Sequence, residues 1–148
     1  MSLCEQLASV RRGTHRLLVR RLSSRTRRSL HQLVALKVIA QREVHTQAQL
    51  AERLLIDAPA ASRLVDRLQE DGLVTREAGA DRRCVRLQVT NACWPEVEVL
   101  EDEARRVDEE VARHLSPEEM SELKRLLDKV HVALSPPNTV VAEKQLAE

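Results

Sequence analysis

Residues 46–90 decide the fold, and they read TQAQLAERLLIDAPAASRLVDRLQEDGLVTREAGADRRCVRLQVT. Thr46 with Gln49 forms a capping-box pattern that opens one short helix. Asp57 is placed to cap a second helix, and Gly72 is placed to end it. The spacing of apolar residues then changes to that of strands. Two short helices followed by a hairpin are the layout of a winged helix-turn-helix, in which one helix enters a DNA major groove.

The second part of this stretch has the alternation of a β-hairpin. Val85, Leu87 and Val89 alternate with polar residues, as in a strand with one buried face. A shorter strand is expected at residues 73–76, and residues 79–81 supply turn chemistry between the two. Two strands alone are marginally stable, so the hairpin is expected to pack on the helices.

Helical spacing continues on both sides of this core. Apolar residues predict a first helix over about 3–22, and Ser29 with Gln32 forms a capping box that opens the next. A long helix follows the hairpin, and Ser116-Pro117 begins a last helix that Pro136-Pro137 stops. We therefore expect a single, mainly α-helical domain over residues 1–148. Its winged helix-turn-helix core covers about 29–90, its dimerisation helices cover about 3–22 and 91–134, and residues 135–148 form a loose tail.

Composition excludes several classes of protein. The chain has no Phe, no Tyr and one Trp, so its core must be aliphatic. It has no apolar run of 18 residues and no apolar signal region, so we expect a cytoplasmic protein without a membrane span. The histidines show no metal-ligand spacing, and we find no phosphate-binding loop and no nucleophile elbow. We expect no enzymatic activity, no metal and no cofactor.

Charge is divided unevenly along the chain. Residues 1–90 contain 17 Lys and Arg against 9 Asp and Glu, whereas residues 91–148 contain 7 against 14. Between Glu5 and Glu43 there is no acidic residue at all. This polarity suits a molecule that turns one face toward a polyanion, although a basic helix in contact with solvent is the alternative.

With these features, the sequence resembles the MarR family of bacterial transcription regulators. The resemblance covers roughly residues 30–134 and is most specific at Ser62-Arg63-Leu64-Val65-Asp66-Arg67-Leu68, Gly72-Leu73-Val74, Asp81-Arg82-Arg83 and Val89-Thr90. It implies a two-fold dimer, joined through the N- and C-terminal helices, that reads a pseudopalindromic operator with half-sites one helical turn apart.

The first turns of the helix after Asp57 carry the candidates for reading bases. A helix in the major groove exposes its N-terminal turns to base edges. Arg makes bidentate contacts with guanine, and Ser can reach a base or a phosphate. The alternative for Arg63 is a surface ion pair with Asp66 or Glu70. The predicted contacts in this helix are Pro59, Ala60, Ser62 and Arg63.

The hairpin carries the second group of candidates. Arg82 and Arg83 at its tip are placed to enter a minor groove, whose negative potential attracts guanidinium groups. Asp81 is expected to orient Arg83 through a bidentate pair, a role that the family resemblance also implies; the alternative is a simple turn residue. Arg76 and Arg86 are expected to contact phosphate.

The leading hypothesis is a homodimeric, sequence-specific regulator of double-stranded DNA, a repressor released by a small lipophilic acid or phenol. That effector is expected near the junction of the first, second and fifth helices, with Trp94 as a reporter. An alternative is a thiol-based sensor through Cys4, and another is a winged helix that docks a protein without binding DNA. The redox roles of Cys84 and Cys93, the operator, the regulated genes and the choice between repressor and activator stay open. For the terminal helices, ordinary intramolecular core is the alternative to a dimer interface.

Overall fold

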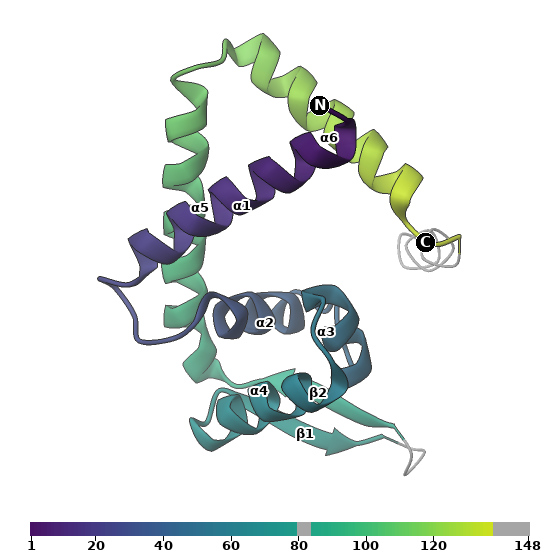
Figure 1. Cartoon of the computed structure of the whole chain (residues 1–148). Helices are drawn as coiled ribbons and strands as arrows, with labels where there is room; N and C mark the ends of the chain where they lie inside the picture. The colour runs from purple at the N-terminus through teal and green to yellow at the C-terminus, as the bar shows by residue number, and fades with distance from the viewer. Residues whose placement is uncertain (80–83, 138–148) are drawn as a thin grey trace. The chain divides into compact units, whose positions relative to one another are not determined.

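The computed structural model of the chain describes residues 1–79 and 84–137 (Figure 1). The expected fold, mainly helical with one small antiparallel hairpin, is confirmed. The chain divides into two compact units, Met1–Val107 and Asp108–Glu148, and the division falls within α5. The elements are α1 (Leu3–Leu22), α2 (Leu30–Ala40), α3 (Gln47–Leu54), α4 (Ala58–Glu70), β1 (Val74–Ala78), β2 (Val85–Val89), a 3-10 turn (Asn91–Cys93), α5 (Trp94–Ala112) and α6 (Pro117–Leu134).

Helices begin where the sequence places their caps. Ser29, Thr46 and Ser116 each accept a hydrogen bond from the backbone three residues on, and the side chain there returns one to the cap backbone. Asp57 accepts from the N–H of Ala60 at 2.7 Å and opens α4. The capping boxes predicted at Ser29 and Thr46, the cap predicted at Asp57 and the helix start predicted at Ser116 are therefore confirmed.

The end of α4 and the start of the hairpin share one turn. Gly72 has φ 74°, and Leu73 donates its N–H to the carbonyl of Leu68 at 2.9 Å. These are the marks of a Schellman ending, which uses a left-handed residue to satisfy the last helical carbonyls. The expected first strand at residues 73–76 is thus wrong at both ends. Leu73 belongs to the helix ending, and pairing continues as far as Ala78 opposite Val85.

The turn between α3 and α4 contains a residue that the sequence does not signal. Leu55 has φ 55° and ψ 44°, which is the left-handed region, although it is not a glycine. Its side chain is 77% exposed, so it gains little from packing. The tight connection of the two helices therefore carries local backbone strain.

The core of the Met1–Val107 unit is aliphatic, as expected. Leu36, Leu50 and Leu68 are completely buried, and with Val65 they hold α2, α3 and α4 together. Leu87 extends this core into the hairpin, and its N–H donates to the carbonyl of His45 at 2.8 Å. The hairpin is thereby fixed to the helices through both side chains and backbone.

In the Asp108–Glu148 unit, α6 is the main described element. Its stripe of large apolar side chains does not become core: no residue of α6 is buried. Across the ranges 1–79 and 84–137, no helix is both long and apolar enough to cross a bilayer.

Candidate nucleic-acid interface

The first turns of α4 present their polar side chains to solvent. Arg63 is exposed and Ser62 is half-buried, while Ala61 and Val65 on the opposite side are completely buried. Among the described residues, Arg63 makes no hydrogen bond and no ion pair. Asp66, its expected alternative partner, instead lies 2.8 Å from Arg76. The guanidinium of Arg63 is therefore available to a ligand outside the chain.

Arg76 lies at the centre of a hydrogen-bonded cluster. Its guanidinium donates to Gln69 on α4 at 2.7 Å and to Gln47 on α3 at 3.0 Å, in addition to its ion pair with Asp66. Its side chain is only a quarter exposed. These contacts join the first strand of the hairpin to both helices of the helix-turn-helix. Arg76 is thus a positioning residue in the free protein, and its contact with phosphate stays a prediction.

Arg86, a second cation of the hairpin, makes no hydrogen bond or ion pair with the residues that the structure describes. Arg86 on β2 is exposed and stands opposite Glu77 in the strand register. The base of the hairpin is tied to the end of α4, because Thr90 donates its hydroxyl to the carbonyl of Gly72 at 2.6 Å. Asp81, Arg82 and Arg83 lie outside the described residues, so their predicted roles at the tip stay predictions.

Among the cavities in the described part of the Met1–Val107 unit, two have linings that suit a small molecule, and both lie away from the first turns of α4. One, of about 450 Å³, is lined by Leu18, Val34 and Leu100, with Arg11 and Lys37 at its border. It is formed by α1, α2 and α5, where the sequence predicts an effector.

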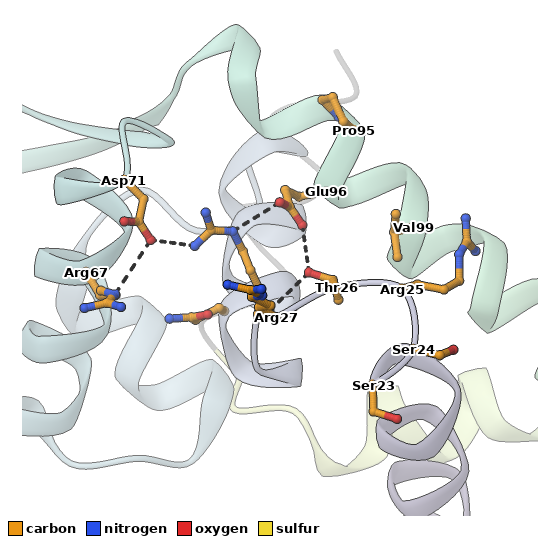
Figure 2. Close-up of a pocket in the computed structure, with 12 residues that line it drawn as sticks. Ser23, Ser24, Arg25, Thr26, Arg27, Arg67, Asp71, Pro95, Glu96 and Val99 are labelled. Carbon is orange, nitrogen blue, oxygen red and sulfur yellow. Dashed lines mark hydrogen bonds and ion pairs between the residues drawn. The ribbon is translucent and has the colours of Figure 1, made fainter.

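The other cavity, of about 770 Å³, was not foreseen from sequence (Figure 2). It lies between the loop after α1, the end of α4 and the start of α5. Arg28 bridges it, at 2.7 Å from Asp71 and 3.3 Å from Glu96. In the sequence, only the arginine-rich run at residues 20–28 points to this cavity. The run does not indicate which carboxylates its arginines contact.

The three cysteines are free thiols in different surroundings. Cys4 is exposed in the first turn of α1, and Cys84 is exposed just before β2. Cys93 is completely buried in the 3-10 turn just before α5, and burial raises the pKa of its thiol. A raised pKa lowers the thiolate fraction, so the Cys93 thiol is a weak nucleophile in this position.

The chain is similar to known proteins over its winged helix and beyond it. The MarR family model matches residues 29–85. MarR from E. coli in its apo form is 26% identical, with 88% of this chain and 97% of that chain covered and a TM-score of 0.75. A mutant of E. coli MarR complexed with operator DNA is 27% identical, with 86% and 92% covered and a TM-score of 0.69.

A more distant structure shares the same fold. The transcriptional regulator BldR from Sulfolobus solfataricus is 24% identical, with 89% of this chain and 94% of that chain covered and a TM-score of 0.75. Residues 29–85, which hold the capped helix pair and the first strand of the hairpin, therefore carry a MarR-family domain, and the chain shares the fold of MarR-family transcription regulators.

Proposed function

We propose that this protein is a homodimer that binds a pseudopalindromic DNA operator and represses transcription until a small molecule releases it. The observation that carries the proposal is the state of Arg63. The apolar side of α4 is buried in the core, while Arg63 on its first turns is exposed and without a partner among the described residues. An unpaired guanidinium at this place suits bidentate contact with a guanine. The solved complex of the E. coli MarR mutant with operator DNA supports the same use of the fold.

The DNA-binding part is tested by titrating duplex DNA from the chain's own promoter region against the protein. Affinity should fall steeply as salt rises, because phosphate contacts release counterions. Arg63→Ala should weaken binding by about 1–3 kcal/mol, the range for a base contact. Arg113→Ala, an exposed arginine in the acidic part of the chain, is the control for loss of charge alone and should change little.

A protein-docking function gives a different result in the same titration. A docking module would show no duplex-dependent signal even at low salt, and Arg63→Ala would then be silent. Arg83→Ala extends the test to the hairpin tip, where we expect a loss of the same size.

The dimer part of the proposal rests on exposed apolar surface. Large side chains on the terminal helices, including Val10 on α1 and Leu126 and Leu127 on α6, are 42–64% exposed in the single chain. Stripes of this kind on helices are a natural interface for a second copy. A two-fold dimer would also carry two recognition helices, as a pseudopalindrome requires.

The effector part of the proposal rests on the 450 Å³ cavity between α1, α2 and α5. Aliphatic side chains line it together with the cations Arg11 and Lys37, and its one carboxylate, on Glu43, is paired with Arg53 at 2.7 Å. Such a pocket suits an apolar body with one anionic end, such as a small lipophilic acid or phenol. Release of DNA by such a compound should be reduced in Lys37→Gln. Hydroperoxide is the comparison arm: release by peroxide alone, lost in Cys4→Ser, would replace this effector with a thiol switch.

A further inference from the structure

The 770 Å³ cavity at the end of α4 has an excess of positive charge. Four arginines line it, against the two carboxylates of Asp71 and Glu96. Arg25 is already paired outside the cavity, at 3.0 Å from Glu103. Figure 2 shows Arg67 and Asp71 on the α4 side, facing the α5 side with Pro95, Glu96 and Val99. The remaining arginines are Arg27, Arg28 and Arg67.

Two of these arginines lack a close partner of their own. Arg27 is exposed and makes no ion pair within the described part of the chain. Arg67 is 65% exposed and reaches Asp71 only at 3.7 Å, on the same Oδ2 that accepts from Arg28 at 2.7 Å. One carboxylate oxygen therefore pairs with two guanidinium groups, so the positive charge of the cavity lining is not fully neutralised.

Arg28 is held differently. Its side chain is only 20% exposed, and its Nε is buried without a hydrogen-bond partner, although Glu96 lies 3.3 Å away. Its Nη1 bond to Asp71 holds the pKa of that carboxyl below its ordinary value. Asp71 caps the C-terminal end of α4, so Arg28 fastens the end of this helix to α5 through Glu96.

We propose that this cavity binds a small organic dianion, with its two charges on Arg27 and Arg67. Ser23, Ser24 and Gln32 add polar partners for its body, and Pro95 and Val99 add a small apolar wall. The volume is in the range of pockets that hold small molecules. The lining is more polar than that of the α1–α2–α5 cavity, where leucine and valine side chains predominate, and this separates the dianion from the lipophilic monoanion proposed there.

A dianion bound to Arg27 and Arg67 withdraws Arg67 from Asp71 and places negative charge beside Arg28, where it competes with Asp71 and Glu96 for that guanidinium. The end of α4 is then released from its link to α5, and the position of Arg63 on the same helix changes. This regulatory step rests on the proposed function, because it requires operator binding by α4. Linkage makes the effect reciprocal, so operator-bound protein binds the dianion less tightly.

The site itself is tested on the full chain without DNA. The probes are succinate, adipate and suberate, with butyrate as the monoanion and succinamide as the neutral compound, all at matched ionic strength. Calorimetry measures binding, and Trp94, next to Pro95 on the cavity wall, gives an independent fluorescence signal. We expect saturable binding of at least one dicarboxylate, and at least about tenfold weaker binding in Arg27→Gln and Arg67→Gln, because each loses a charge-assisted contact. Arg12→Gln, an exposed arginine on α1 outside the cavity, should bind as the parent does.

Three outcomes overturn the site: no saturable binding of any dicarboxylate, equal binding of butyrate, or equal weakening in Arg12→Gln. If Arg27→Gln and Arg67→Gln weaken operator binding while the probes do not bind, these cations contact the DNA backbone instead. A second titration adds the best probe to the protein–operator complex. Binding of the probe with unchanged operator affinity overturns the regulatory step and leaves the site in place. Absence of operator binding altogether contradicts the proposed function without affecting the calorimetric result.

Discussion

Helices α2 and α6 are both rich in leucine and valine, yet they differ in burial. In α2, five residues are buried, among them Leu33 and Leu36 with no exposed surface. In α6 none is buried, and Leu126 keeps 45% of its side chain exposed. Both helices begin with the same capping box, so local sequence determines that each is a helix. Local sequence does not determine which other part of the molecule packs against each helix.

The difference between the two helices lies in how much apolar surface each one buries. α2 is surrounded by α3, α4 and the hairpin, and its apolar surface is satisfied there. No residue of α6 is buried, including those of its apolar stripe, and we propose that a second copy covers this stripe. Mutations in the two helices should therefore respond differently to protein concentration, because only the α6 surface depends on association.

The largest expected effect is from Leu126→Asp. Each copy in a dimer loses the burial of one leucine, worth about 2 kcal/mol, so a dimer loses at least about 4 kcal/mol before the carboxylate is desolvated. Sedimentation should show a monomer at concentrations where the parent is a dimer, with helical content retained. Lys129→Asp, which introduces the same carboxylate at an exposed position on α6 outside the leucine stripe, is the matched control. A parent protein that sediments as a monomer at micromolar concentration removes the premise.

Next in size is Leu36→Ala in α2. Removal of a completely buried leucine leaves a cavity in the core, which costs about 2–5 kcal/mol. Denaturant unfolding should give this loss at every protein concentration when it is measured in the Leu126→Asp background. A loss below 1 kcal/mol would mean that α2 is not the centre of a tightly packed core.

A smaller effect is expected from Arg76→Ala, which separates the hairpin from the helices it contacts. The variant loses one ion pair and two hydrogen bonds, and partial exposure limits the cost to about 1–2 kcal/mol of unfolding free energy. Arg86→Ala on the neighbouring strand removes an exposed side chain and should cost less than about 0.5 kcal/mol. If the two variants are equally stable, the Arg76 cluster does not hold the hairpin in place.

The sequence predicts whatever depends on neighbours along the chain. Ser29, Thr46, Asp57 and Gly72 mark the ends of helices because the groups they bond lie within a few residues. Exposure of Arg63 also follows from its place on α4, opposite the periodic apolar residues. These features required no knowledge of the tertiary fold.

Contacts between distant elements were not predictable in this way. The positive charge of Arg76 predicts a contact with phosphate, but in the structure its partners are three side chains of the same chain. These partners lie 7, 10 and 29 residues away in sequence, and only the packing of the hairpin on α3 and α4 brings them together. The Arg28 bridge joins Asp71 and Glu96 from different helices and has no signature in spacing. Leu55 shows the same limit for backbone, because a leucine gives no signal of a left-handed turn.

The smallest effect is expected at Leu55, and a substitution at Gly72 is the control. Leu55→Gly removes the cost of a left-handed leucine, about 1–2 kcal/mol, but it also raises the entropy of the unfolded chain by about 0.5–1 kcal/mol. We expect a net gain of about 0.5 kcal/mol in the free energy of unfolding, independent of concentration. Gly72→Ala reverses the change at φ 74°, where an added Cβ meets nothing within 4 Å, so its expected loss of about 1 kcal/mol is purely conformational. Thermal unfolding of both variants in the Leu126→Asp background measures the pair without the dimer. If Leu55→Gly lowers the melting temperature, Leu55 has a packing role that its exposed side chain does not show in the single chain.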